Sequence, residues 1–406
     1  MNPRQYVFNG LKETLMEKKY SNLVLKQFDL NPQEQRFATA LFYTTLQNYT
    51  WMSYQVESFM NKRPKEEVMI LMAMACAQYY LMDNNAIYAI VNETVELSKQ
   101  NQLGSYSGLI NSVLKKTFDH PLRYSQSDNL VRDLSINTSH PEWMVALFVA
   151  QLGYEKAKLL CEHNNTVAPL YVRLNPNKIS YQEANQVYGI YTDHRGSLIA
   201  PGTILNSDGL DSGKIIIQDI ASQQVVETFS QKSGVRFLDC CCAPGTKLSQ
   251  LALFEDSSGV GIDLHPHRIE LTGQLLKRWG LDNVELKAMN FLDYPEESFD
   301  SILCDVPCSG LGVLRRKPDM KFTVASEDLD ELQELQKQIL DKAYQLLKVN
   351  GELVYSTCTL NKKENEKQIE QFLARYPDMK LLSQRTLEPW ELNSDGFYIA
   401  HCIKQG

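Results

Sequence analysis

Two cysteines, Cys308 and Cys358, each follow an apolar segment of the chain. Cys308 lies in the run DVPCSG (residues 305–310), and Cys358 lies in the run YSTCTL (residues 355–360). A cysteine reacts as its thiolate, which forms readily where positive charge lowers the pKa of the thiol. Lys247 and a cationic cofactor are candidate sources of that charge. Both apolar segments have the pattern of strands, so the two thiols would lie at the carboxyl ends of strands, where sheets of this kind bind ligands. The two thiols are therefore candidates for nucleophilic chemistry.

The other cysteines are better explained as small apolar side chains. This interpretation applies to Cys76, Cys161 and Cys402, and largely to Cys240 and Cys304. The chain starts with no signal peptide, so its nine cysteines favour reduced thiols rather than a disulfide framework. No Cys or His spacing resembles a zinc site, and we therefore expect no metal.

A loop with a single glycine, CCAPGTK (residues 241–247), follows the apolar segment that ends near Asp239. Gly245 would let the backbone approach a ligand closely at a helix N-terminus, although the pattern is not that of dinucleotide enzymes. Asp263 ends the next apolar segment, where an acid can bond a ribose, or can simply be solvated. Asn290 ends a third segment, where its amide can bond the edge of adenine. Together these features favour one nucleoside ligand.

The charges around this loop favour an adenosyl ligand with a cationic sulfonium over a pyrophosphate. Apart from Lys247 the loop lacks basic residues, and Asp263 and Asp305 lie at neighbouring strand ends. A thiolate that adds to carbon 6 of cytosine would make carbon 5 reactive toward the methyl group of such a ligand. A second thiol could help the later elimination, and Asp305 could bond the N3/N4 edge of the base.

The elements that must position these residues fall into three predicted domains. Residues 1–125 are helical by their three- and four-residue apolar spacing, with breaks at Pro32, Pro64 and residues 82–85. Residues 126–230 mix helix and strand patterns, as in a connector. From 231 to 406 strands alternate with helices, which predicts a mostly parallel sheet covered on both faces, with its ligand site at the carboxyl ends of the strands. The predicted helical core includes Leu11, Leu15, Phe37, Leu41 and Ile70.

The net charge of −8 argues against broad nonspecific binding to nucleic acid, but not against a local basic patch. No apolar run approaches membrane-spanning length, and we expect a cytoplasmic protein. The candidate RNA-binding residues are Arg173, Lys178, Arg315, Arg316 and Lys317, with ordinary surface charge as an equal alternative. Tyr171 could hold a flanking nucleotide.

With these motifs in place, the chain resembles the Sun/Fmu (RsmB) family of RNA cytosine-5 methyltransferases over almost its whole length. CCAPGTK is similar to the family's cofactor loop, and DVPCSG and STCTL are similar to its two cysteine motifs. AIVNETVELSK and GLINSVLK are similar to its NusB-like helical RNA-binding domain, and YVRLNPNK and IIIQDIAS to its connector. The resemblance implies an α/β fold: a Rossmann-like S-adenosylmethionine-dependent methyltransferase domain preceded by an all-α NusB-like domain and a small α+β connector.

The resemblance also implies roles for individual residues. Cys358 would be the nucleophile, Cys308 would assist release of the methylated RNA, and Lys247 would lie near the target base. Asp305 would serve both the base and the cofactor. The implied contacts of S-adenosylmethionine are Cys241, Cys242, Ala243, Pro244, Gly245, Thr246, Lys247, Asp263, Arg268, Asn290 and Asp305. The implied partner is 16S rRNA, free or in an early assembly intermediate, and we expect a monomer.

Three positions depart from the family pattern, and three alternatives remain. Thr246 replaces a glycine, Cys242 replaces an alanine, and Asn290 replaces an aspartate. The chain could methylate another RNA, or it could be a catalytically inactive RNA-binding assembly factor. It could also be a DNA cytosine-5 methyltransferase, in which Cys308 would be the nucleophile.

Overall fold

The computed structural model describes residues 2–27, 29–82 and 86–406, and the chain folds into two compact units. The helical unit comprises Met1–Thr166 and Leu314–Ser326, and the sheet unit comprises Val167–Val313 and Glu327–Gly406. This division differs from the predicted boundaries after residues 125 and 230, because the first three helices of the predicted connector group with the helical unit. Residues 83–85 of the predicted break lie outside the described residues.

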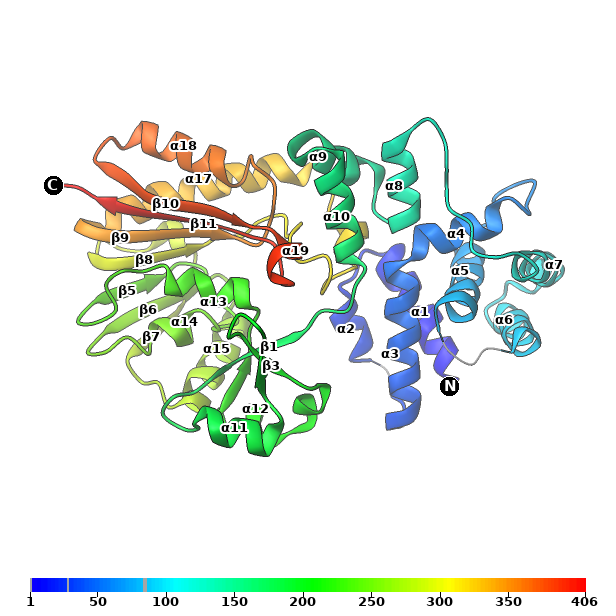
Figure 1. The fold of residues 1–406 in the computed structure, drawn as a ribbon, viewed down its shortest axis with the longest axis horizontal. Coiled ribbons are helices and arrows are strands. Elements are labelled where there is room, and N and C mark those ends of the chain that lie inside the picture. Colours follow the sequence, from blue (N-terminus) through cyan, green and yellow to red (C-terminus); the bar gives the residue numbers. More distant parts are fainter. Residues whose placement is uncertain (1, 28, 83–85) are drawn as a thin grey trace. The chain divides into compact units, whose positions relative to one another are not determined.

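The helical unit is built around α5 (Glu66–Leu81), which is buried from Val68 to Gln78 (Figure 1). An apolar sequence on all sides of this helix explains its central position, since no face of it gains from contact with water. The other helices of the first 166 residues are α1 (Pro3–Leu15), α2 (Ser21–Leu25), α3 (Pro32–Gln47), α4 (Tyr49–Glu57), α6 (Ile87–Gln100), η1 (Gly104–Tyr106), α7 (Ser107–Phe118), α8 (Leu130–Thr138), α9 (Glu142–Leu152) and α10 (Tyr154–Asn164).

The predicted core of the helical unit is confirmed. Leu11, Leu41 and Ile70 are fully buried, and Leu15 and Phe37 pack against them while partly exposed. Between the predicted breaks at Pro32 and Pro64 the structure has a further break at Asn48, which ends α3 and precedes α4.

The segment Leu314–Ser326, which contains α16 (Met320–Thr323), belongs to the helical unit although it follows Cys308 in the chain. Asp319 accepts a hydrogen bond of 2.9 Å from the Ser21 hydroxyl. Lys321 is fully buried, and its ammonium donates to Asn165 Oδ1 at 2.9 Å and to the Gln47 carbonyl at 3.2 Å. Burial lowers the pKa of Lys321 to about 7. These polar contacts fix the segment among the helices.

The sheet unit begins with a small antiparallel sheet in the order β2-β3-β1-β4. Its strands are β1 (Leu170–Leu174), β2 (Tyr191–Thr192), β3 (Leu198–Ala200) and β4 (Ile215–Ile217). The helices α11 (Tyr181–Tyr188) and α12 (Asp208–Asp211) and the turn η2 (Gly202–Asn206) connect these strands.

A seven-stranded sheet follows, in the order β10-β11-β9-β8-β5-β6-β7. Its strands are β5 (Arg236–Asp239), β6 (Ser258–Asp263), β7 (Val284–Ala288), β8 (Phe299–Asp305), β9 (Leu347–Thr357), β10 (Met379–Leu387) and β11 (Phe397–Lys404). The five strands from β9 to β7 are parallel, and β11 and β10 add antiparallel strands beside β9. The predicted mostly parallel sheet is therefore confirmed.

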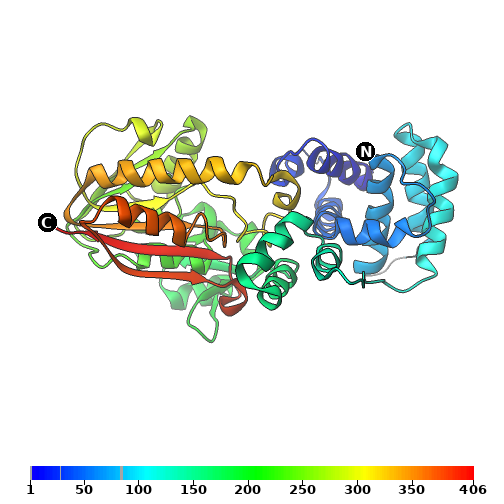
Figure 2. The same cartoon turned by 90° about the horizontal axis from the view of Figure 1, so that it is seen from above.

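Helices cover both faces of the large sheet, as predicted (Figure 1, Figure 2). One face carries α17 (Asp328–Leu346) and α18 (Glu366–Arg375), and the other carries α13 (Ile220–Glu227), α14 (Leu248–Leu251) and α15 (Pro266–Trp279). Two short turns, η3 (Phe291–Asp293) and α19 (Pro389–Leu392), lie in the connections.

The order of strands reverses direction between β5 and β8, which are neighbours although β6 and β7 lie between them in the chain. Such a switch point is where open α/β sheets bind ligands, beyond the carboxyl ends of the strands. Asp239 and Asp305 end the two strands at this position. Across the described parts of the chain, helices long and apolar enough to cross a membrane are absent.

Candidate active site

The structure brings Cys308 and Cys358 together at the carboxyl ends of β8 and β9. These strands are parallel neighbours in which Asp305 pairs with Ser356, so the loops that follow them start side by side. The two Sγ atoms are 3.3 Å apart, and both residues are half-buried. The hydrogen bond with Cys358 and burial raise the pKa of Cys308, which keeps this thiol protonated near neutral pH.

Lys247 lies beside this pair and forms an ion pair with Asp305, with 2.7 Å between Nζ and Oδ2. Burial lowers the pKa of Lys247, but the charge of Asp305 and the hydrogen bond to it outweigh burial, and the net shift is upward. The second oxygen of Asp305 accepts a 2.7 Å hydrogen bond from the Ser356 hydroxyl. Lys247 is therefore a persistent positive charge at the site, as the chemistry of a thiolate requires.

Asp239 is a buried carboxyl group to which the sequence patterns assigned no role. Burial and the neighbouring charge of Asp305 raise the pKa of Asp239 to about 8. Among the described residues, its Oδ1 receives one long hydrogen bond of 3.4 Å, from the Cys241 amide, and its buried Oδ2 receives none. An unpartnered buried oxygen is costly, so a partner from outside the chain, a water or a ligand group, would stabilise it.

The predicted cofactor loop, residues 241–247, turns between β5 and α14. Its Cys242 amide donates to the Ile262 carbonyl on β6 at 2.8 Å, and Gly245 has a φ of 98°. A Cβ atom on Gly245 would lie 2.8 Å from Cγ2 of Thr272, so this position requires glycine. Thr246 has no left-handed φ, and its substitution for a glycine therefore causes no strain there.

The other predicted cofactor residues lie at the ends of β6 and β7. Asp263 is buried, and its Oδ2 pairs with Arg268 at 3.1 Å. Arg268 also donates to the Ala243 carbonyl at 3.0 Å, so it links the end of β6 to the cofactor loop. Asn290 is exposed, and its side-chain oxygen accepts from the Leu292 amide at 3.2 Å, which leaves its NH₂ group as the donor for a ligand.

Two of the predicted RNA-binding residues are engaged inside the sheet unit instead. Arg173 stacks on Trp279 at 4.5 Å and donates to the Thr246 carbonyl at 3.1 Å, and burial lowers its pKa to about 10. Lys178 donates to the Ser212 carbonyl at 2.9 Å and to the Arg278 carbonyl. The contacts of Arg173 argue against its predicted role in RNA binding and give it a structural role that supports the loop at residues 241–247. Lys178 is exposed, so its role in RNA binding stays a prediction.

The three basic residues at 315–317 differ in how exposed their side chains are. Arg315 is buried in the helical unit, where it donates to the Thr166 carbonyl at 3.3 Å and lies 3.1 Å from the His163 ring nitrogen. Arg316 is half-buried and Lys317 is exposed. Tyr171 is 1% exposed and donates to the Leu392 carbonyl, so it cannot stack on a nucleotide as expected. The burial of Arg315 likewise argues against a phosphate contact.

The remaining cysteines are buried, as predicted for packing residues. This applies to Cys76, Cys161, Cys240, Cys304 and Cys402. Within the described ranges, groups of three or more His, Cys, Asp or Glu side chains placed to hold a metal ion do not occur.

The sequence did not reveal the residues that hold the two cysteine loops in place. Glu364 and Asn365, just before α18, are both buried and hydrogen-bonded to these loops. Gln336 of α17 is also buried and bonded to the Cys308 loop. The run KENE (residues 363–366) after STCTL was the available signal for these residues. Charged and polar side chains next to a site motif can be buried when they hydrogen-bond to the loops of that motif.

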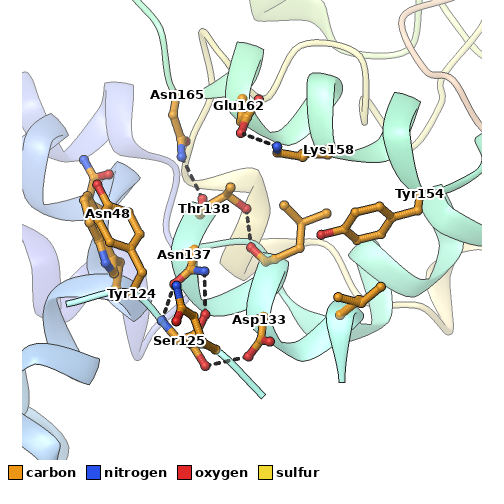
Figure 3. A pocket seen from close by; sticks show the side chains of 14 residues that line it. Asn48, Tyr124, Ser125, Asp133, Asn137, Thr138, Tyr154, Lys158, Glu162 and Asn165 are labelled. Atoms are coloured by element: carbon orange, nitrogen blue, oxygen red, sulfur yellow. Dashed lines mark hydrogen bonds and ion pairs between the residues drawn. The ribbon is translucent and has the colours of Figure 1, made fainter. Parts of the chain in front are cut away.

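The helical unit contains a separate cavity of about 640 Å³, with Tyr124 and Tyr154 on opposite sides (Figure 3). Tyr124 is 57% exposed, and its ring lies 5.1 Å from that of Trp51. Several polar groups of the cavity bond to one another; the Asn137 side chain, for example, exchanges two hydrogen bonds with the Ser125 backbone. Exposed aromatic rings of this kind can stack on unpaired bases.

Comparison with protein families gives three matches that together cover most of the chain. A model described as 16S rRNA methyltransferase RsmB/F matches residues 226–402. The NusB family matches residues 1–119, and a ferredoxin-like domain of RsmF/B-like methyltransferases matches residues 140–187.

Individual relatives agree with these matches. A Bacillus subtilis (strain 168) protein named probable ribosomal RNA small subunit methyltransferase B is 30% identical over 442 residues, covering 99% of both chains. The Vibrio cholerae (serotype O1, strain ATCC 39315 / El Tor Inaba N16961) ribosomal RNA small subunit methyltransferase B is 30% identical and covers 93% of this chain and 92% of its own.

Two solved structures share the fold. The crystal structure of PH0851 covers 100% of this chain and 99% of its own with a TM-score of 0.81 at 20% identity. A methyltransferase homolog protein from Pyrococcus horikoshii covers 69% of this chain and 100% of its own, with a TM-score of 0.60 and 27% identity.

Proposed function

The chain belongs to the 16S rRNA methyltransferase RsmB/F family, and on this premise we propose that it methylates carbon 5 of a cytosine in 16S rRNA through a covalent adduct with Cys358. The observation that supports this mechanism best is the 3.3 Å separation of the Cys308 and Cys358 sulfur atoms beside Lys247 and Asp305. A covalent adduct needs one thiol to form, a second thiol beside it can help the later elimination, and the pair offers both.

The residues at the strand ends fit S-adenosylmethionine, which supplies a methyl group on a cationic sulfonium. Three carboxyl groups, those of Asp239, Asp263 and Asp305, lie near one another, as their influence on the pKa of Asp239 shows. The buried Oδ2 of Asp239 lacks a partner that a cationic cofactor group would provide. Asp263 and Asn290 would hold the adenosine, and the backbone of residues 241–247 would approach the remainder.

In this mechanism the residues act in sequence on one pyrimidine ring. The Cys358 thiolate, favoured by the Lys247 ammonium, adds to carbon 6, and the electron pair released toward carbon 5 forms a bond to the cofactor's methyl carbon. The bond between that carbon and the sulfonium sulfur breaks, and its electron pair stays on the sulfur, so the cofactor leaves as a neutral thioether. Carbon 5 then loses its proton to solvent water, and the electron pair of that C–H bond re-forms the double bond between carbons 5 and 6. Cys358 leaves carbon 6 as the thiolate, and aromaticity returns. Cys308 assists this release, and Asp305 bonds the N3/N4 edge of the base. The target base must be unpaired or turned out of its helix.

The roles of the two cysteines are tested by alanine substitution. Cys358→Ala should abolish methyl transfer, because no adduct can form. Cys308→Ala should accumulate an RNA–protein complex that survives denaturation, because release is blocked. A reversal of these phenotypes would favour the mechanism in which Cys308 attacks, as in the alternative of a DNA methyltransferase. Assaying methyl transfer to rRNA and to duplex DNA separates these substrates.

The substrate is tested by mapping 5-methylcytosine in the RNA of a deletion strain. We expect one cytosine of 16S rRNA to lose its methyl group. Because the proposed substrate is ribosomal RNA, we expect the reaction to take place in the cytoplasm. Loss of the modification from another rRNA site or from tRNA would identify a different RNA substrate. If labelled S-adenosylmethionine transfers no tritium to unmodified rRNA, the alternative of an inactive assembly factor is supported.

A further inference from the structure

The residues on both sides of Cys308 are held by a buried carboxylate and a buried amide. Glu364 accepts from the Ser309 amide at 2.9 Å through one oxygen and from the Ser309 hydroxyl at 2.6 Å through the other. Gln336 donates to the Pro307 carbonyl at 3.0 Å and to Glu364 at 3.0 Å. The positions immediately before and after Cys308 are therefore fixed to α17 and to the residue pair that precedes α18.

The neighbouring residue, Asn365, holds Cys358 in the same manner. Its side-chain oxygen accepts from the Thr357 hydroxyl at 2.6 Å, and its NH₂ group donates to the Thr359 carbonyl at 2.9 Å. Thr357 and Thr359 are the residues on either side of Cys358. The hydroxyls of Ser309 and Thr359 also meet at 2.8 Å, which joins the two loops directly.

We propose that Glu364 and Asn365 are positioning residues that set the distance between the two reactive sulfur atoms. The proposal rests on the function proposed above, and it assigns Glu364 to the Cys308 loop and Asn365 to the Cys358 loop. We call the three side chains Gln336, Glu364 and Asn365 the clamp. All three are at most 1% exposed, so their hydrogen bonds do not compete with water.

The chemistry of Glu364 explains why a carboxylate is needed in the clamp. Its two oxygens accept four hydrogen bonds, from the Ser309 amide and hydroxyl, Gln336 and Asn361, and none of these donors is a lysine or arginine. A carboxylate only accepts, whereas the NH₂ group of glutamine would face either the Ser309 amide and Gln336 or the Ser309 hydroxyl and Asn361. Of these groups only the Ser309 hydroxyl can turn to accept. Glu364→Gln therefore keeps the size of the side chain but loses at least one of these four hydrogen bonds and the negative charge that strengthens the others.

The clamp predicts different kinetic consequences on its two sides. Glu364→Gln should displace the Cys308 loop more than the Cys358 loop, which Asn365 still holds, so release should slow more than methyl transfer and the RNA adduct should accumulate. Asn365→Ala should move Cys358, so the adduct should form more slowly and should not accumulate. Because misplacement of a reacting group by about 1 Å can cost on the order of 100-fold, we expect changes of at least about tenfold in each step.

The test measures adduct formation and release in single-turnover reactions with rRNA and labelled S-adenosylmethionine. Glu370→Gln is the matched control, because it makes the same change of charge at an exposed position of α18. Ser309→Ala removes one hydroxyl of the Cys308 loop with little change in volume, and it replaces Glu364→Gln if that variant does not fold. Ser309→Ala should likewise slow release.

A second readout does not depend on catalysis. Diamide oxidises two thiols to a disulfide and is itself reduced to the hydrazine, and peptide mass spectrometry identifies the Cys308–Cys358 bond. We expect this bond to form about tenfold more slowly in Asn365→Ala and Ser309→Ala, which keep the charge of Glu364, than in the native chain or Glu370→Gln. Unchanged disulfide formation together with native adduct kinetics would overturn the clamp. If Cys308→Ala traps no RNA adduct, the proposed covalent mechanism is wrong. The diamide experiment still tests the clamp in that case, because disulfide formation does not depend on catalysis.

Discussion

Cys308 and Cys358 touch each other, yet their surroundings suit different tasks. The pKa of Cys308 is raised by Cys358, by burial and by the charge of Glu364, so Cys308 is a protonated thiol at neutral pH. The charge of a Cys358 thiolate is among the causes that raise the pKa of Lys247, so the two groups are close enough to interact. The same attraction stabilises the thiolate. This asymmetry agrees with Cys358 as the proposed nucleophile.

Lys247→Met should therefore slow both methylation and the reaction of Cys358 with an alkylating agent. Removing the ammonium reduces the thiolate fraction, and we expect the alkylation rate of Cys358 at pH 7 to fall about tenfold. The rate is measured by iodoacetamide labelling and peptide mass spectrometry, with Lys380→Met, an exposed position on β10, as the control. An unchanged labelling rate would show that Lys247 does not activate the Cys358 thiol.

Asp239 should make cofactor binding depend on pH. Burial and Asp305 raise its pKa to about 8, so this carboxyl group is mostly protonated at pH 7. A cationic cofactor placed beside it favours the ionised form, and binding should release a proton. We expect affinity for S-adenosylmethionine to rise from pH 6 to pH 8, and calorimetry in two buffers of different ionisation enthalpy should detect the proton. Equal enthalpies in both buffers would contradict this assignment.

The same group predicts an effect on stability without cofactor. Because the folded-state pKa lies above the unfolded value of 3.8, the folded chain binds more protons between about pH 4 and pH 8. Stability contributed by the protonated carboxyl is therefore lost as pH rises through this range. Asp239→Asn should raise the melting temperature at pH 8 relative to the native chain, and should weaken cofactor binding. A lower melting temperature in this variant at pH 8 would show that the Asp239 carboxyl does not destabilise the folded chain at that pH.

At the scale of elements, the turn between β5 and α14 depends on one glycine. Gly245→Ala would place a Cβ atom 2.8 Å from Thr272 Cγ2 and 3.2 Å from Leu275 Cδ2, at a φ of 98°. We expect a loss of about 1–3 kcal/mol in unfolding free energy, together with weaker cofactor binding. Denaturant titration measures the first quantity.

The matched control for this turn is Gly108→Ala in α7. A Cβ atom on Gly108 meets nothing within 4 Å, and alanine favours helix, so this variant should gain about 0.5–1 kcal/mol. If both variants lost the same stability, the shape of the cofactor turn would not be the cause.

Much of the order of strands and helices was predictable, because the patterns that indicate each element lie within a short stretch of sequence. Alternating strand and helix patterns indicated the parallel sheet, and acids at the ends of apolar runs marked the site, because Asp239, Asp263 and Asp305 each end a strand. Contacts between distant segments were not predictable. Arg173 looked like a surface basic residue because a sequence does not show that Trp279 lies under its guanidinium. Glu364 was overlooked for the same reason, since its partners include residues of the Cys308 loop and of α17.

At the scale of the whole molecule, acidic composition and an RNA substrate must be reconciled. The net charge of −8 opposes an even spread of RNA contacts, so binding must come from few positions. Of the five basic residues predicted to bind RNA, Arg173 and Arg315 are occupied by internal bonds, whereas Lys178 and Lys317 are exposed. We therefore expect few phosphate contacts, and a shallow dependence of affinity on salt.

Lys317→Ala tests this expectation directly. Each phosphate neutralised by a cation releases condensed counterions, so losing one contact should reduce the slope of log K against log salt by about 0.7 on single-stranded RNA. Affinity for an rRNA fragment should fall uniformly across sequences, because a phosphate contact carries no base information. Lys380→Ala removes the same charge from an exposed position and should leave the slope unchanged if contacts are local. Equal losses in both variants would mean that net charge, rather than a site at Lys317, controls binding.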